Sequence, residues 1–372
     1  MSWILATGSD MPSCDMRTRI MRIRTSMLFA ALATFTARAS AQWTPQASPT
    51  TAEFRGLSVV SPTVAWASGT HGRVVQTTDG GRTWALDSVA AAGSFDLRAI
   101  VARSATQAWA ITSGPAEQGQ AHVFHTDDGR QWTSQFETTR QGVFLDAMAF
   151  WDDLHGIALS DPVGGKPFVI VTDDGGKSWT QVPTDDAPAI LPNEASFAAS
   201  GTCLTIQGGS TVWFATGGGA RARVFRSSDR GRTWSVADAP VHAGNQSSGL
   251  FSIAFSDSLH GVAVGGDYAK PKEPLDNVAV TSDGGRTWRL AKGPLPAGFM
   301  SAVAYIPGTG GRSLVAVGLA GTARSADGGE TWTMIDTVAY NSVAFASRDV
   351  GWAVGPQGRI ARWTPTPRVQ KP

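Results

Sequence analysis

Apolar and polar positions alternate along this 372-residue chain in short runs separated by glycine-rich turns. Runs such as Asp146–Phe150 (DAMAF) and Gly156–Ser160 (GIALS) put apolar side chains on alternate positions, which is typical of β-strands. A third apolar run, Phe168–Val171 (FVIV), follows them and leads into a polar turn. Sets of this kind recur roughly every 50 residues, a period typical of propellers and solenoids. The pattern predicts an all-β chain built from repeated sheets of about four strands.

A polar motif, Ser/Thr-x-Asp-x-Gly-x-x-Trp, follows the third run of most repeats. Its chemistry suits a hairpin between a third and a fourth strand, because Asp accepts turn amides, Gly adopts positive φ and Trp buries a large ring. Five copies are complete or nearly so, and a sixth, His125–Trp132, begins with His. The residues predicted to be structural are Asp79, Asp127, Asp174, Asp229, Asp283 and Asp327 with Trp84, Trp132, Trp179, Trp234, Trp288 and Trp332. No Glu stands at the twelfth position that a calcium loop needs, and no metal site is expected.

The repeats number seven when their first two strands are counted. The seventh has a third strand, Gly358–Arg362, but neither the turn motif nor a fourth strand. Trp43–Gln46 resembles the sequence that follows a motif tryptophan, so we expect it to complete this last repeat and hide its edge. The sequence therefore predicts a seven-bladed β-propeller of four-stranded antiparallel blades over residues 42–366, with a short tail over 367–372.

The N-terminus has the pattern of an export signal. Four arginines, Arg17, Arg19, Arg22 and Arg24, precede the short apolar stretch Met27–Ala37, and Ala39-Ser40-Ala41 suits cleavage. The apolar stretch is too short to span a bilayer, so no transmembrane segment is expected after residues 1–41 are removed. Met16, Met21 and Met27 are alternative translation starts. We expect a periplasmic or secreted protein.

Charge and motifs exclude several function classes. The formal net charge of +1 gives no field that would attract nucleic acid. The chain has no dinucleotide fingerprint, phosphate-binding loop or zinc-protease motif, so no cofactor is expected. Of its two cysteines, Cys14 lies in the predicted signal, and Cys203 is interpreted as a small buried apolar group.

The motif copies, the segment Phe54-Arg55-Gly56-Leu57 and the Gly-x-Ala-Val-Gly strands together resemble the photosystem II stability/assembly factor family, in particular its branch in non-photosynthetic bacteria. The resemblance implies a lumenal or periplasmic propeller that holds a partner protein during assembly of a membrane complex. The turn motifs alone are less specific, because sialidases, other glycoside hydrolases and sortilin-like receptors also carry them.

Propellers bind ligands at the mouth of the central channel, where each inner strand begins. Alignment of the seven inner strands predicts an entrance column of Arg55, Arg98, Asp146, Glu194, Phe251, Ser301 and Asn341. The residues that follow them are all small: Gly56, Ala99, Ala147, Ala195, Ser252, Ala302 and Ser342. Loops between second and third strands add Asp161, Asp267 and Tyr268.

Two interpretations of this column remain open beside that of a solvated rim of ion pairs. In the first, an exported scaffold binds a protein partner of the cell envelope, or a glycan, with Arg55 and Arg98 as forked donors and Asp146 and Glu194 as acceptors. In the second, a sialidase-like glycoside hydrolase uses Asp146 and Glu194 with Tyr340. The second set is incomplete, because the column offers no third arginine for a sialic acid carboxylate.

Overall fold

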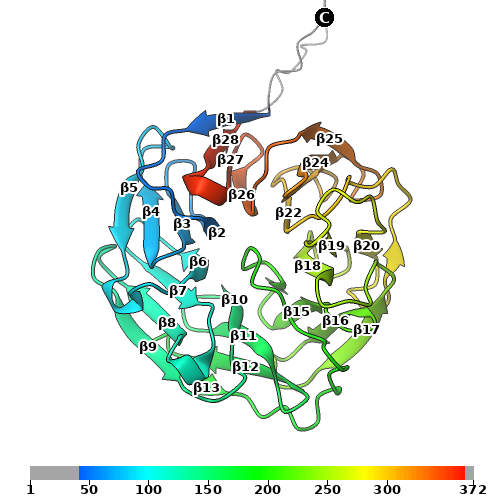
Figure 1. Cartoon of the computed structure of the whole chain (residues 1–372), viewed down its shortest axis with the longest axis horizontal. Coiled ribbons are helices and arrows are strands. Elements are labelled where there is room, and N and C mark those ends of the chain that lie inside the picture. Colours follow the sequence, from blue (N-terminus) through cyan, green and yellow to red (C-terminus); the bar gives the residue numbers. More distant parts are fainter. Residues whose placement is uncertain (1–41, 365–372) are drawn as a thin grey trace, which may run out of the picture. The chain divides into compact units, whose positions relative to one another are not determined.

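The computed structural model describes residues 42–364, which form seven four-stranded antiparallel sheets arranged as the blades of a ring (Figure 1). This confirms the predicted all-β, seven-bladed propeller. The predicted signal, residues 1–41, and the predicted tail, residues 367–372, lie outside the described residues. Within residues 42–364, the helices are short 3-10 turns, η1 (Ala90–Ala92), η2 (Ala116–Gln118) and η3 (Pro356–Gly358), and none is long and apolar enough to cross a membrane.

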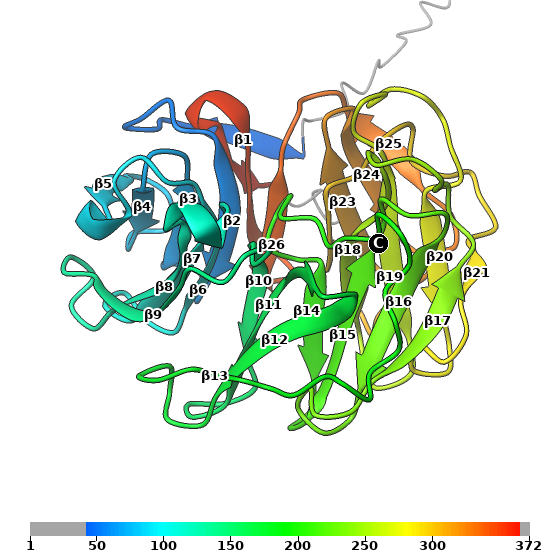
Figure 2. The ribbon, with the colours of Figure 1, turned by 60° about the horizontal axis from the view of Figure 1, so that its bottom comes forward.

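Each blade places its first strand nearest the axis and its fourth at the rim; Figure 2 shows this succession for β10 to β13. The first three blades are β2 (Phe54–Val59), β3 (Ala65–Gly69), β4 (Arg73–Thr77) and β5 (Ala85–Ser88); β6 (Leu97–Ala102), β7 (Ala108–Thr112), β8 (Ala121–Thr126) and β9 (Thr133–Thr138); β10 (Leu145–Phe150), β11 (Gly156–Val163), β12 (Lys166–Thr172) and β13 (Thr180–Gln181). The next three are β14 (Leu204–Gln207), β15 (Thr211–Thr216), β16 (Ala222–Ser227) and β17 (Ser235–Ala239); β18 (Ser248–Phe255), β19 (Gly261–Asp267), β20 (Val278–Thr281) and β21 (Arg289–Leu290); β22 (Ala302–Tyr305), β23 (Leu314–Gly318), β24 (Gly321–Ser325) and β25 (Thr333–Asp336).

The last blade joins the two ends of the described chain. Its strands are β26 (Ser342–Ser347), β27 (Val350–Val354), β28 (Ile360–Trp363) and, at the rim, β1 (Trp43–Gln46). β1 pairs antiparallel with β28, with Trp43 opposite Trp363, and the Trp43 indole N–H donates to Thr322 Oγ1 of the sixth blade at 3.1 Å. The predicted closure of the ring by the N-terminal strand is confirmed.

Aromatic rings fill the spaces between blades. Trp66 and Trp352, on second strands, are almost fully buried. Motif tryptophans meet them edge-on from the next blade: Trp132 lies 6.3 Å from Trp66, and Trp84 lies 6.3 Å from Trp352. Such contacts bury large apolar areas and favour one angle between neighbouring blades. The motif tryptophans are therefore part of the cores between blades.

The Ser/Thr-x-Asp turns are closed by their own side chains. In the fifth blade, Asp283 accepts hydrogen bonds from the Thr281 hydroxyl and from the amides of Arg286 and Thr287. Burial raises the pKa of Asp283, but the bonds from Thr287 and its neighbours outweigh it and lower that pKa to about 2. This is the structural role that the sequence predicts for these aspartates.

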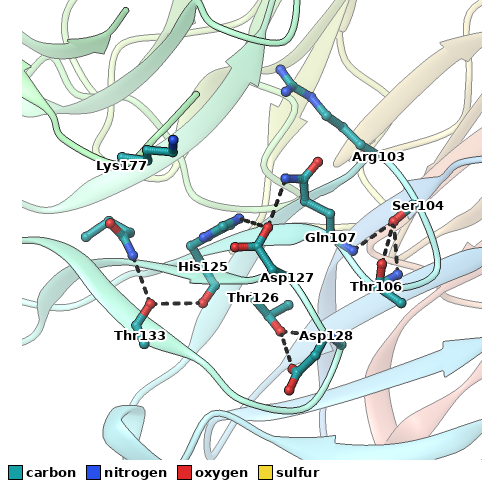
Figure 3. A network of polar contacts seen from close by, with 12 residues as sticks. Arg103, Ser104, Thr106, Gln107, His125, Thr126, Asp127, Asp128, Thr133 and Lys177 are labelled. Atoms are coloured by element: carbon teal, nitrogen blue, oxygen red, sulfur yellow. Dashed lines mark hydrogen bonds and ion pairs between the residues drawn. The ribbon is translucent and has the colours of Figure 1, made fainter. Parts of the chain in front are cut away.

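For one aspartate of this set the prediction is wrong. In the second blade Asp128, not Asp127, accepts the Thr126 hydroxyl (Figure 3). Asp128 also accepts the amides of Arg130 and Gln131. Thr126 pairs with Ala108 and thus takes the first position of the motif. From this position to the motif tryptophan, Trp132, the turn is one residue shorter than in the other blades. Asp127 instead accepts the Gln107 amide at 3.0 Å.

The fourth inner strand also differs from the prediction. Glu194 and Ala195 do not start it; β14 begins at Leu204, where Leu204 pairs with Phe214. Residues 194–203 form a separate segment, which we call the crossing segment. Ala195 is held outside the sheet by one isolated bridge to Gly217.

Candidate functional site

The mouth of the ring lies at the end opposite the Ser/Thr-x-Asp turns. Because neighbouring strands in a blade are antiparallel, inner strands begin at the mouth and the loops between second and third strands return to it. A cavity of about 420 Å³ opens there, which we call the mouth cavity. Its walls include six residues of the predicted entrance column: Arg55, Arg98, Asp146, Phe251, Ser301 and Asn341. Asp161 and Tyr268, predicted from the loops, line it too.

The crossing segment lines this cavity with Ala195–Ala199 and reaches into the middle of the ring (Figure 1). Ala199 O accepts Arg55 Nη1 of the first blade at 3.3 Å, and Ser200 Oγ donates to Ser301 O of the sixth at 2.8 Å. Gly201 has a left-handed φ of 70°, and a Cβ there would lie 2.6 Å from the Cβ of Ala99 in the second blade. The segment therefore reaches the first, second and sixth blades from its position beside the fourth.

A second cavity of about 270 Å³ lies within the inner strands, lined by Ser200–Thr202 of the crossing segment with residues of β2, β6, β10 and β14. The same segment thus borders both cavities, with Ala195–Ala199 facing the mouth cavity. The crossing segment therefore lies between the two cavities, and we call it the floor of the mouth cavity.

Glu194, the seventh predicted residue of the column, lies outside the lining of the mouth cavity. Its carboxylate is buried and accepts hydrogen bonds from Arg223 Nε at 2.9 Å, from Arg223 Nη2 and from the Thr216 hydroxyl at 2.5 Å. Its second oxygen also accepts the Leu191 amide at 2.8 Å. Glu194 therefore anchors the start of the crossing segment, and it is not free to accept a ligand.

Aromatic side chains form one wall of the cavity. Phe197 of the crossing segment stacks on Phe251 with ring centroids 4.0 Å apart, and Phe299 meets Phe251 edge-on at 4.7 Å. Tyr268 closes the group edge-on at 6.0 Å from Phe251 and remains 47% exposed. This wall offers apolar contact and π faces to a ligand.

The two arginines of the opposite wall already have acidic partners. Arg55 pairs with Glu53 at 2.6 Å, and Arg98 pairs with Asp96 at 3.2 Å. In both cases the carboxylate stands two residues before the arginine. Burial lowers the pKa of Arg55, and the charge of Glu53 opposes that shift. These arginines are thus less available to an anionic ligand than the sequence predicts.

Two carboxyl groups of the third blade have no such partner. Asp146 is only 1% exposed, and its Oδ2 has no hydrogen-bond partner among residues 42–364. Asp161 Oδ1 accepts the Ser196 amide at 3.1 Å. Burial raises the pKa of Asp146 well above its usual value, with the nearby Asp161 adding to the shift and Arg98 opposing it. Burial likewise raises the pKa of Asp161 to about 6.

The remaining predicted residues take structural positions. Asn341 donates to Phe54 O at 2.9 Å and so ties the last blade to the first. Asp267 is buried and accepts the Ser247 hydroxyl at 2.6 Å, which holds its loop. Tyr340 is buried against Trp43, 5.8 Å between rings, and burial raises its pKa to about 12. Tyr340 and Glu194 therefore do not form the nucleophile pair that a sialidase would need.

Sequence reasoning missed several residues that line the mouth cavity or pair with its lining. Glu53 and Asp96 could have been found, because each stands two positions before its arginine at the same point of consecutive repeats. Phe197 was hidden by the wrong alignment of the fourth repeat. No cluster of three metal-ligating side chains occurs among residues 42–364.

No protein-family model and no curated protein sequence matches this chain. Solved structures share its fold. A structure of YCF48 bound to a D1 peptide is 18% identical with a TM-score of 0.61, over 87% of this chain and 96% of that chain. YCF48 from Cyanidioschyzon merolae is 17% identical with a TM-score of 0.61, over 87% and 99%.

Propeller enzymes are similar as well. The GH74 xyloglucanase from Xanthomonas campestris is 18% identical with a TM-score of 0.55, over 86% of this chain and 53% of that chain. A GH74 enzyme from Niastella koreensis is 12% identical with a TM-score of 0.58, over 81% and 50%. At these identities the likeness extends to the fold alone, so function has to be argued from the mouth cavity.

Proposed function

We propose that this protein is an exported β-propeller that binds a segment of a partner polypeptide in the mouth cavity, as a binding or assembly factor of the cell envelope. The observation that carries the proposal is the floored mouth cavity, with an aromatic wall beside charged groups. Binding pockets commonly combine apolar walls with a few polar groups that fix orientation. The shared fold with YCF48, which has been solved with a D1 peptide, supports a polypeptide as the ligand.

The glycoside hydrolase alternative lacks support at this cavity. Hydrolysis of a glycosidic bond needs two carboxyl groups that flank one bond. Glu194, half of the predicted pair, is engaged by Arg223 and does not line the cavity that holds Asp146. Tyr340 is buried in the core beside Trp43.

Peptide binding can be tested with an array of fluorescent unstructured peptides and the purified protein. Tyr268→Ala removes an exposed ring at the mouth, and Leu259→Ala is the matched control, an exposed apolar side chain between β18 and β19 at the opposite end. We expect Tyr268→Ala to weaken the bound peptides about tenfold, as is common for an aromatic anchor, and Leu259→Ala to leave them unchanged. Absence of any bound peptide, or equal loss in both variants, would refute binding at the mouth.

Export needs its own test because it depends on residues 1–41. Expression in a bacterial host followed by fractionation and N-terminal sequencing would locate the mature protein. Cleavage after Ala41 with the protein in the envelope or medium is expected. An uncleaved chain in the cytoplasm would contradict the proposed location.

A further inference from the structure

The charges around the mouth cavity do not cancel. Arg55 and Arg98 are the two cations of its described lining, and each already forms an ion pair, Arg55 with Glu53 and Arg98 with Asp96. Asp146 and Asp161 remain, and neither forms an ion pair with a cation among residues 42–364. The described part of the cavity therefore carries an excess of carboxylate over cationic groups.

Asp146 is the less satisfied of the two. Its side chain lies at the start of the third inner strand, lines the cavity and leaves Oδ2 buried without a hydrogen bond. A buried polar atom without a partner is costly, and native proteins seldom keep one unless a ligand, ion or water completes it. A donor that enters from the mouth cavity would supply the missing bond.

The aromatic wall defines the rest of the ligand. Phe197, Phe251 and Tyr268 line the same cavity as the two carboxyl groups. A cation over an aromatic face is attracted by the π electrons, and the methylene stem of a long basic side chain packs well on such rings. A small polar ligand such as a free hydroxyl would leave this wall unused.

We infer that the mouth cavity receives a lysine or arginine side chain of the partner polypeptide, with its cation against Asp146 and Asp161 and its stem along Phe197 and Phe251. The inference rests on the proposed peptide binding and assigns the chemistry of the anchoring residue. It reverses the expectation from the sequence, in which Arg55 and Arg98 would bind an anionic group.

Binding of a basic side chain is coupled to protons. The groups that face the two carboxyls are Arg98 on β6, the Ser196 amide of the crossing segment and the Cys203 thiol at its end. Arg55 on β2 lines the cavity beside them. Burial raises the pKa of Cys203, so that thiol stays neutral. Burial raises the pKa of Asp146 and raises that of Asp161 to about 6, so that below about pH 6 Asp161 holds a proton, which a bound cation displaces. Affinity therefore rises as the pH rises through about 6.

Small probes test the inference without a known partner. n-Butylammonium and n-butyrate have similar chains and opposite charges. Titration of each, followed by the amide resonance of Ser196, should show saturable binding of n-butylammonium with proton release and no binding of n-butyrate. Asp146→Asn should weaken n-butylammonium about tenfold or more, whereas Asp349→Asn, an exposed site between β26 and β27, should not. Tighter binding of n-butyrate, lost in Arg55→Gln, would overturn the inference in favour of an anionic ligand.

The peptide array separates this inference from the proposed function. We expect bound peptides to share a Lys or Arg whose replacement by Gln lowers affinity about tenfold in the wild type and much less in Asp146→Asn. Bound peptides that tolerate Gln would refute the basic anchor while keeping peptide binding. If no peptide binds, the proposed function fails, and the outcome with n-butylammonium still decides whether the cavity selects cations.

Discussion

Asp161 makes the stability of the third blade sensitive to pH. Its pKa is raised by burial to about 6, whereas the same group in the unfolded chain titrates near its usual value of 3.8. The folded state therefore holds this proton more tightly than the unfolded chain. The contribution of Asp161 to the free energy of unfolding is complete below about pH 4 and is lost as the pH rises through about 6.

The variant Asp161→Asn should remove this dependence. Asn keeps an oxygen for the Ser196 amide and carries no charge, so we expect it to stabilise the protein above about pH 7 by about 2 kcal/mol and to change little near pH 4. Chemical denaturation at several pH values measures the difference. Asp349→Asn serves as the exposed control with the same change of charge. If the variant is less stable than wild type near pH 8, burial of the charged Asp161 carboxylate does not destabilise the protein as we predict.

The turn of the second blade shows how a hairpin selects its acceptor. Thr126 is fixed by strand pairing with Ala108, and Asp128 is then the residue whose carboxylate reaches the turn amides. Asp127, immediately before it, is three-quarters exposed and lies near His125 and Gln107 (Figure 3). Two adjacent aspartates thus have different structural roles.

This difference predicts unequal effects of alanine at the two positions. Asp128→Ala should lower the free energy of unfolding by about 1–3 kcal/mol, because it leaves the Thr126 hydroxyl and two amides without their acceptor. Asp127→Ala should change it by less than about 0.5 kcal/mol. Thermal unfolding of the two variants side by side measures both effects, and the reverse order would contradict the assignment of the shorter turn.

The crossing segment depends on a buried ion pair. Glu194 and Arg223 are both nearly inaccessible to water and saturate each other with hydrogen bonds. Removing one partner of such a pair leaves a buried charge, which costs several kcal/mol.

Glu194→Ala should therefore loosen the floor of the mouth cavity. We expect a loss of about 3–5 kcal/mol in stability and faster hydrogen exchange of the amides in residues 194–203. Asp238→Ala, which breaks the exposed Arg221 pair, is the matched control and should cost less than about 1 kcal/mol. Unchanged exchange in the crossing segment of Glu194→Ala would show that other contacts hold it.

The sequence predicts six of the seven inner strands in register, because their small-apolar-small pattern reflects crowding at the axis. It fails in the fourth repeat, where it takes Glu194–Ala198 as the inner strand although Ser196 and Phe197 break the small-apolar-small order that Thr202–Ile206 keeps. The pairing of Leu204 with Phe214, between neighbouring strands of the fourth blade, shows that Thr202–Ile206 contains the inner strand. Because the prediction places Glu194–Ala198 in that strand, it misses the crossing segment and the contribution of Phe197 to the aromatic wall. The path of this segment depends on contacts with other blades, such as that of Ser200 with Ser301, which leave no pattern in the sequence.

The whole ring depends on its seam in the last blade. β1 covers the edge of β28, and Trp43 packs among residues of the sixth and seventh blades. Without β1 the backbone of β28 would present an open edge, which favours pairing with other chains.

Deletion of the seam strand tests this directly. A chain that begins at Ser48 should unfold at a lower temperature than one that begins at Gln42 and should self-associate through its open edge. Thermal unfolding and light scattering after size-exclusion chromatography measure the two effects. Thr44→Ala, which removes only the exposed contact with Thr364 at 2.6 Å, should leave both properties unchanged. A monomeric chain from Ser48 with wild-type stability would refute the importance of the seam.

The seam also has a consequence for the rate at which the fold forms and is lost. Thr44 and Thr364 are 320 positions apart along the chain. β1 cannot pair until β28 has been synthesised. Bringing two strands together over this sequence separation has a large cost in loop-closure entropy. Once the contact has formed, unfolding has to break it before blades can separate from an end. We expect slow folding, an even slower loss of the closed ring, and a long lifetime of the native state.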